Sequence, residues 1–171
     1  MILAVDVGNS NTTVGLFNGT GELLFRALLE TSRSKTRDQC AIELLGVFQL
    51  YGADACTVDG AILSSVVPPL TTIFTDAIAR LTGIPPMVVG PGIRTGLNIK
   101  AEIHNQLGSD IVASSVAAIA KYPSPIVMVD MGTATSLSLI VGSVYEGCII
   151  MPGLALALDA LSERAAALPP I

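Results

Sequence analysis

The chain has 171 residues, of which 51% are hydrophobic and only 13% are charged, and its formal net charge is −5. The length fits one domain or two small ones, and the hydrophobic content allows a large core. Because a charged share of about 25% is usual, the low charge favours an obligate oligomer or a missing partner segment. The net negative charge and the lack of an extended Lys/Arg cluster argue against nucleic-acid binding, which needs a basic surface.

The high hydrophobic content raises the question of a membrane segment. A spanning helix needs about 20 consecutive apolar residues, whereas the best run, Ile111–Ala120, stops at Lys121. No basic region precedes the apolar run at the N-terminus, so a signal peptide is not expected. We therefore expect a soluble, cytoplasmic protein that has no membrane partner. Its cysteines, Cys40, Cys56 and Cys148, lack metal-ligand spacing and are expected to be buried in a reducing compartment.

The pattern of apolar and polar residues predicts a strand-rich first half. The expected elements are strands over 2–7, 12–17 and 23–29, with a hairpin turn at 18–21, then a polar loop over 31–37, a helix over 38–50, a strand over 60–67, a helix over 70–82 and a short strand over 86–89. Pro68 and Pro69 are expected to form a rigid turn that ends the fourth strand. Gly90–Asn98 is expected to be a glycine-rich turn.

The second half repeats this order and then stops. The expected elements are a helix over 108–121, strands over 125–130, 135–141 and 147–151, and a helix over 154–168. This order predicts a duplicated α/β fold with an unfinished second copy, and we expect domains over 1–115 and 116–171. Either the chain is a truncated fragment, or its second domain is short and another chain completes its sheet.

One short motif occurs once in each half. Val5–Asn9 is nearly repeated as Val129–Thr133, and each copy follows an apolar strand and leads into a stretch of small polar residues. An aspartate at the strand end can hold Mg²⁺ directly or through water. The glycine lets the backbone approach phosphates, and the following amides and side chains can donate to phosphate oxygens. Two such loops predict a nucleotide held between them, with its phosphate charge offset by amides and cations because the motifs contain no Lys or Arg.

Six stretches together resemble one protein family. They are VDVGNSNTTVGLF at 5–17, SSVVPPL at 64–70, GPGIRTGL at 90–97, GSDIV at 108–112, DMGTATS at 130–136 and PGLALALDALSERAAALP at 152–169. With them the chain resembles the type III pantothenate kinases of bacteria, in the acetate kinase/Hsp70/actin superfamily. The resemblance implies duplicated ribonuclease H-like (actin-like ATPase) domains, with mixed sheets flanked by helices and an incomplete second domain. It also implies ATP-dependent phosphorylation of pantothenate to 4′-phosphopantothenate, the first step of coenzyme A biosynthesis.

The resemblance further implies two ATP-binding loops. The first would consist of Asp6, Val7, Gly8, Asn9, Ser10, Asn11, Thr12 and Thr13. Asp6 would lie near Mg²⁺, directly or through water. The second loop would bind ATP through Gly132 and Thr133, and Asp130 matches the ligand of an activating monovalent cation, K⁺ or NH₄⁺.

The resemblance places the acceptor site at the start of the predicted helix over 108–121. Asp110 matches the catalytic aspartate that receives the proton of the pantothenate hydroxyl. Gly108, Ser109 and Ile111 fall in the same substrate-binding stretch. The family acts as a homodimer with its substrate site near the subunit interface, which fits the low charge of this chain.

The acceptor half of the pattern is altered, whereas the nucleotide half is intact. Ile111 stands where the family has an arginine that helps to hold the pantothenate carboxylate. Ala101 replaces a tyrosine that lines the pocket, and Glu102–His104 replaces Asp-Asn-Pro. Two alternatives therefore stay open: a non-catalytic, nucleotide-binding regulatory relative, and a kinase of another small alcohol in the same superfamily.

A small basic patch precedes the predicted helix over 38–50. It consists of Arg33, Lys35 and Arg37. The patch is either a solvated loop or a lid on the nucleotide side. Arg94, in the glycine-rich turn, lies on the surface or at an interface, or meets a phosphate or the substrate carboxylate.

Overall fold

The structure is a computed structural model that describes residues 1–90, 93–100 and 107–164. The chain divides into two compact units, each built on one sheet. The first unit consists of Met1–Ile93 with Gly108–Asp110, and the second consists of the described residues of Arg94–Leu107 and Ile111–Ile171. This division follows contacts within the chain. The expected domain boundary after residue 115 stays a prediction.

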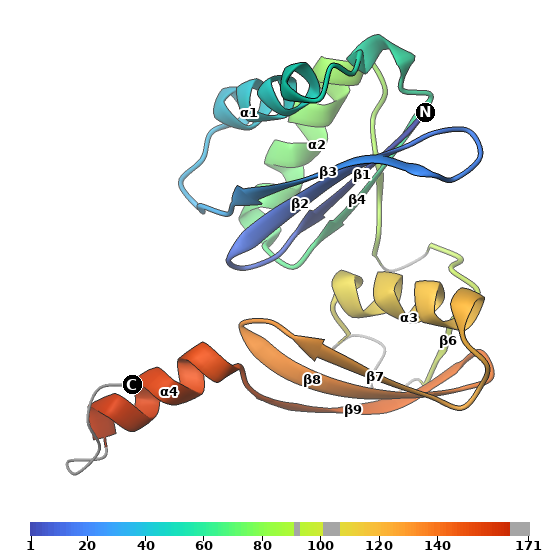
Figure 1. The fold of residues 1–171 in the computed structure, drawn as a ribbon, viewed down its shortest axis with the longest axis vertical. Helices are drawn as coiled ribbons and strands as arrows, with labels where there is room; N and C mark the ends of the chain where they lie inside the picture. The colour runs from blue at the N-terminus through green and yellow to red at the C-terminus, as the bar shows by residue number, and fades with distance from the viewer. Residues whose placement is uncertain (91–92, 101–106, 165–171) are drawn as a thin grey trace. The chain divides into compact units, whose positions relative to one another are not determined.

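The sheet of the first unit has the strand order β3-β2-β1-β4-β5. The strands are β1 (Ile2–Val7), β2 (Asn11–Phe17), β3 (Leu23–Glu30), β4 (Gly60–Ser65) and β5 (Met87–Val88). The first three form an antiparallel meander, and β4 and β5 extend it in parallel with β1. The helices α1 (Arg37–Leu50) and α2 (Pro68–Thr82) cover one face of this sheet, as Figure 1 shows.

The core of the first unit follows from the alternation of its strands and the apolar stripes of its helices. Successive strand residues face opposite sides, and Leu3, Val5 and Val7 on one side of β1 are at most 3% exposed. Each helix buries four residues at the i, i+4, i+7, i+8 spacing of one helical face. These residues are Cys40, Leu44, Val47 and Phe48 in α1, and Leu70, Phe74, Ala77 and Ile78 in α2.

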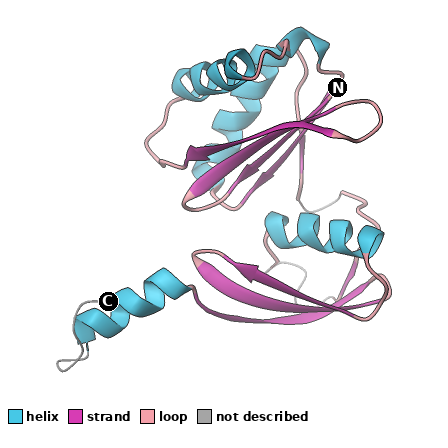
Figure 2. Ribbon diagram, viewed as in Figure 1, coloured by secondary structure: helices cyan, strands magenta, loops and turns pink. Residues whose placement is uncertain are grey.

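The sheet of the second unit has the strand order β6-β9-β8-β7. The strands are β6 (Asn98–Ile99), β7 (Ile126–Met131), β8 (Ala134–Val141) and β9 (Val144–Pro152). Helix α3 (Ser109–Lys121) packs on one face through a small apolar cluster that includes Ala118 and Ile140. Helix α4 (Leu154–Arg164) follows β9 (Figure 2), and it buries none of its described residues. The predicted mixed α/β architecture with two sheets is therefore confirmed.

Several predicted boundaries were wrong. The strand expected over 60–67 ends at Ser65, because Pro68 and Pro69 are the first residues of α2 rather than a turn that ends the strand. Proline suits the first turn of a helix, where its fixed φ is helical and its missing N–H is not needed. The glycine-rich turn expected over 90–98 gives way to β6 at Asn98, which pairs in parallel with β9. A short 3₁₀ turn, η1 (Ala55–Thr57), was not predicted.

Two predictions concern the last elements of the chain. Strand β9 runs over Val144–Pro152 and is longer than the expected 147–151, because the two-residue turn at Gly142 joins it directly to β8. The described part of α4 ends at Arg164. The remainder of the helix expected over 154–168 lies outside the described residues.

The three cysteines differ in environment, so the expectation that all are buried was wrong. Cys40 is buried in α1, whereas Cys56 in η1 and Cys148 in an exposed stretch of β9 are accessible, and all three are free thiols. Burial raises the pKa of the Cys40 thiol, and the carboxylate of Glu43 raises it further. Within the described residues, every helix is too short or too polar to cross a membrane.

Candidate functional site

The first predicted phosphate loop is the tight connection between β1 and β2. The N–H of Gly8 donates to the carbonyl oxygen of Asn11 at 3.0 Å. A Cβ atom at Gly8 would lie 3.0 Å from that same oxygen, which is closer than side-chain carbons ordinarily approach. Glycine is therefore needed for the close approach of the two strands. Asn9 and Ser10, at the tip of the loop, are exposed.

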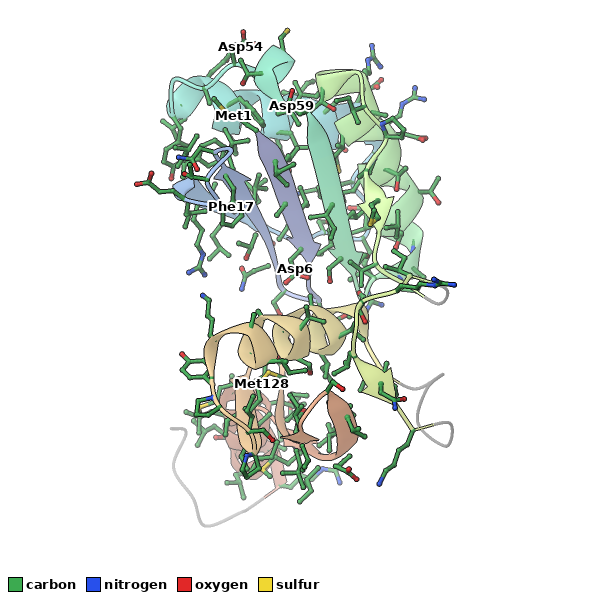
Figure 3. The ribbon with its side chains drawn as sticks, turned by 90° about the vertical axis from the view of Figure 1, so that its right-hand side faces the viewer. Met1, Asp6, Phe17, Asp54, Asp59 and Met128 are labelled. Carbon is green, nitrogen blue, oxygen red and sulfur yellow. The ribbon has the colours of Figure 1, made fainter. Side chains whose placement is uncertain are left out.

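Asp6 lies at the carboxyl end of β1, as labelled in Figure 3. Its side chain is on the face of the sheet opposite to the buried residues Val5 and Val7, and it is exposed. In the sheet register, Asp6 stands between Thr13 on β2 and Ser64 on β4. A carboxylate flanked by two hydroxyl side chains forms an oxygen-rich edge.

Ser109 fastens the start of α3 to the carboxyl end of β4. Its hydroxyl accepts hydrogen bonds from the Ser64 hydroxyl at 3.1 Å and the Ser65 N–H at 3.0 Å, and it donates to the Ser65 carbonyl oxygen at 3.0 Å. This link joins residues 44 positions apart. It brings Gly108–Asp110 into the first unit, beside the strand that neighbours Asp6.

Asp110 is held over Gly108. A Cβ atom at Gly108 would lie 2.4 Å from Oδ1 of Asp110 and 3.3 Å from a methyl carbon of Val66. Only glycine leaves this carboxylate in its place. The structure therefore brings the predicted metal-side aspartate, Asp6, and the predicted catalytic aspartate, Asp110, to the carboxyl ends of the adjacent parallel strands β1 and β4. This edge is where ligands bind in open α/β sheets.

The second predicted loop joins β7 to β8 in the second unit. The N–H of Gly132 donates to the carbonyl oxygen of Ala134, two residues ahead, at 3.0 Å, whereas Gly8 donates to Asn11, three residues ahead. Asp130 is exposed and pairs in register with Ser136, just as Asp6 pairs with Thr13. The duplicated motif thus forms two tight strand–turn–strand loops, of which the second is one residue shorter than the first.

Gly153 supports the second loop and was not singled out from the sequence. Its N–H donates to the carbonyl oxygen of Thr133 at 3.0 Å. A Cβ atom there would lie 2.2 Å from the carbonyl oxygen of Gly132 and 2.6 Å from that of Thr133. The Pro-Gly pair at the end of β9 falls in the stretch over 152–169 that resembles the family, but such a pair is equally typical of a simple turn.

No role was predicted for Thr31, or for Ser64 beyond its place in the stretch over 64–70 that resembles the family. Ser64 contacts Ser109, and the N–H of Thr31 donates to the carbonyl oxygen of Ser10 at 2.9 Å in the first phosphate loop. Both contacts join residues far apart in sequence. Hydroxyl residues are common in strands and loops, so their pattern alone gives no signal.

Of the altered acceptor positions, the structure describes only Ile111. Ile111 is half-buried and packs against the apolar cluster of the second unit. Ala101 and Glu102–His104 lie outside the described residues. The structure thus gives Ile111 a packing contact, at the position where the resemblance implies an arginine.

The described residues contain no group of three or more His, Cys, Asp or Glu side chains that could hold a metal ion. Mg²⁺ in nucleotide sites is held by one or two carboxylates, with phosphate and water oxygens as its other ligands. The single exposed carboxylate of Asp6, beside Thr13 and Ser64, fits that donor set.

A family model of type III pantothenate kinases matches residues 2–171. The type III pantothenate kinase of Listeria monocytogenes is 41% identical over 99% of this chain and 65% of its own length. That of Geobacillus sp. is 41% identical over 100% of this chain and 66% of its own length. The chain belongs to the type III pantothenate kinase family. It spans about two thirds of the length of these curated relatives.

Solved structures of lower sequence identity show the fold. A protein named as a Baf family transcriptional activator from Campylobacter jejuni has a TM-score of 0.57 and 20% identity, and covers 98% of this chain and 62% of its own. A protein named as a 2-dehydro-3-deoxygalactonokinase from Sinorhizobium meliloti has a TM-score of 0.58 and 13% identity, and covers 97% of this chain and 58% of its own. The Aquifex aeolicus Ppx/GppA phosphatase has a TM-score of 0.52 and 16% identity, and covers 99% and 57%. The predicted fold class, mixed α/β with two sheets flanked by helices, is confirmed, and the chain matches 58% and 57% of the length of the last two structures.

Proposed function

We propose that this chain carries the ATP-binding and acceptor-activating residues of a pantothenate kinase, which transfers the γ-phosphoryl group of ATP to the hydroxyl of pantothenate. The observation that supports this most directly is that Asp6 lies at the carboxyl end of β1 and that the Ser109 link holds Asp110 at the carboxyl end of the adjacent strand β4, in a chain of this family. The product is 4′-phosphopantothenate, the first intermediate of coenzyme A biosynthesis.

In this proposal the loop over Asp6–Thr13 binds the phosphates of ATP through its amides and hydroxyls. Asp6 holds Mg²⁺, which neutralises charge on the phosphates when it is bound. In the second loop, Gly132 and Thr133 bind the nucleotide, and Asp130 holds K⁺ or NH₄⁺. Phosphoryl transfer has a loose transition state, so positioning and charge neutralisation supply most of the catalysis.

Asp110 orients the acceptor. Its carboxylate accepts the proton of the pantothenate hydroxyl while the hydroxyl oxygen bonds to the γ-phosphorus and the bond from that phosphorus to the bridging oxygen breaks. ADP leaves with the electron pair of that bond. Gly108, Ser109 and Ile111 form the surrounding substrate-binding stretch. The enzyme works as a cytoplasmic homodimer in this proposal.

The test measures ADP formation that depends on both ATP and pantothenate, with Mg²⁺ and K⁺ present. Asp110→Asn is expected to lower kcat by about 100-fold or more, because general base catalysis contributes about 10²–10⁴-fold, while the affinity for ATP stays within about twofold of wild type. ATP binding without any turnover of pantothenate would instead support the non-catalytic relative.

The packing of Ile111 against an apolar cluster favours a second candidate, a kinase whose acceptor lacks the pantothenate carboxylate. A comparison of kcat/KM for two acceptor substrates distinguishes the two candidates. An N-alkyl amide of pantothenate, which has the same hydroxyl and no carboxylate, is assayed beside pantothenate. A kcat/KM at least tenfold higher for the amide favours the second candidate, and the reverse order supports pantothenate as the acceptor.

A further inference from the structure

The polar loop that precedes α1 is fastened to the first phosphate loop. The N–H of Thr31 donates to the carbonyl oxygen of Ser10 at 2.9 Å. The hydroxyls of Thr31 and Thr12 share a hydrogen bond of 2.8 Å, and Thr12 is only 1% exposed. The loop over residues 31–36 therefore does not leave the sheet freely. Its first residue, Thr31, is held by hydrogen bonds to the phosphate loop.

The other end of this loop is fixed as well. Thr36 caps α1 in a capping box with Gln39, which satisfies free amides of the first helical turn. The ammonium group of Lys35 donates to the carbonyl oxygen of Glu30 and, at 2.9 Å, to Glu43. Arg33 lies between Thr31 and Lys35, and its side chain contacts the phosphate loop instead of the Glu43 carboxylate.

Arg33 reaches the tip of the phosphate loop. Its Nη2 atom donates to the side-chain oxygen of Asn9 at 3.4 Å. Asn9 follows Gly8 directly and is exposed. A guanidinium group carries five N–H donors in a planar fork, so one contact with a neutral amide leaves donors for a further acceptor.

Arg33 differs from the neighbouring cationic side chains in its ion pairs. Lys35 pairs with Glu43, and Arg37 and Arg80 both pair with Asp38. Among the residues that the structure describes, no ion pair includes Arg33. The phosphate loop over Asp6–Thr13 contains no Lys or Arg of its own. A polyphosphate bound there would meet Arg33 as the positive side chain already within hydrogen-bonding distance of the loop.

We infer that Arg33 binds the terminal phosphates of ATP, so that the loop over residues 31–36 forms one wall of the nucleotide site. This inference rests on the proposed ATP-binding function of the first loop. The planar guanidinium matches phosphate oxygens in a bidentate geometry, which a lysine ammonium cannot reproduce. The bond to Asn9 holds the group ready beside the loop, and the bound phosphates replace or share that contact.

The experiment compares the affinities of Arg33→Ala, Arg33→Lys and the wild type for ATP and for adenosine by isothermal titration with Mg²⁺ present. Arg33→Ala is expected to weaken ATP binding about tenfold or more, which corresponds to about 1.4 kcal/mol, and to leave adenosine binding unchanged. Arg33→Lys is expected to fall between them, because it keeps the charge and loses the fork. The matched control is Arg37→Ala, which removes the same charge from a residue four positions away that pairs with Asp38.

The outcomes separate the inference from the proposed function. ATP affinity of Arg33→Ala within twofold of wild type would overturn the inference, as would an equal loss for ATP and adenosine or an equal loss in Arg37→Ala. If the wild-type protein binds no ATP, the proposed function itself fails. Thermal melting of each variant shows whether the fold is retained, and Arg33→Lys supplies the comparison if Arg33→Ala does not fold.

Discussion

Gly153 shows how one residue can set the position of a whole loop. Its backbone lies so close to the carbonyl oxygens of Gly132 and Thr133 that no Cβ atom fits between them. The contact places the end of β9 directly under the turn that carries the second copy of the motif. A methyl group at this position must displace backbone rather than a flexible side chain.

We therefore expect Gly153→Ala to shift the second loop. Overpacking of this kind costs about 1–3 kcal/mol, and the displaced turn would also weaken ATP binding if Thr133 contacts the nucleotide as proposed. Gly46→Ala is the control, since Gly46 lies in α1 with nothing within 4 Å of the added methyl. That change is expected to stabilise the protein by about 0.5–1 kcal/mol. Urea unfolding measures both, and equal stabilities of the two variants would contradict the prediction.

Ser109 acts at the scale of an element, because it fixes where α3 starts. Its hydroxyl bridges the side chain of Ser64 and the backbone of Ser65. Removal of the bridge leaves a partly buried N–H without its acceptor, which costs about 1–3 kcal/mol. The start of α3 would then move away from β4, together with the Asp110 carboxylate.

Ser109→Ala is accordingly expected to lower kcat more than it raises the KM for ATP. Ser114→Ala is the control, because Ser114 lies in the same helix and is exposed. Its kinetics and unfolding midpoint are expected to match the wild type. Steady-state kinetics and thermal melting test the pair. If Ser109→Ala changes stability alone and leaves kcat unaltered, Ser109 does not position Asp110.

The elements that could be predicted from sequence are those with strong local patterns. β1 and β2 follow from their local apolar patterns, and the duplicated motif revealed both tight loops. The extent of α1 was also predicted, but three of the apolar residues on which that prediction rested, Ile42, Leu45 and Leu50, are exposed, so the predicted buried face was wrong. The two-residue strand β6 depends entirely on pairing with β9, about 45 residues away, so nothing local predicts it. Likewise Ser64 belongs to the candidate site only through its contact with the distant hydroxyl of Ser109, and Gly153 only through its contacts with the distant carbonyl oxygens of Gly132 and Thr133. Local propensity cannot encode such contacts.

At the scale of the whole molecule, the repeat allows equivalent positions of the two units to be compared. Leu3, Val5 and Val7 in β1 are 0%, 3% and 0% exposed under α1 and α2. The equivalent residues Val127, Val129 and Met131 in β7 are 65%, 54% and 75% exposed.

The exposed apolar face of the second unit continues across β8 and β9. Leu139 is 42% exposed, and Ile149 and Met151 are 64% and 43% exposed. They share one face of the sheet with Val127, Val129 and Met131, because the register pairs them across the strands. Apolar faces of this extent mark interaction sites or cause association.

The face can be tested with one substitution at equivalent positions of the repeat. Val129→Lys places a charge on the exposed face, and it is expected to leave the melting temperature nearly unchanged while it reduces self-association of the 171-residue chain. Val5→Lys, the matched change in the first unit, buries an unpaired charge beneath the helices and is expected to unfold the protein, at a cost above about 4 kcal/mol. Sedimentation velocity and thermal melting measure both variants. If Val129→Lys destabilises the protein as much as Val5→Lys does, the face is covered in solution, and the concentration dependence of that loss shows whether a second copy covers it.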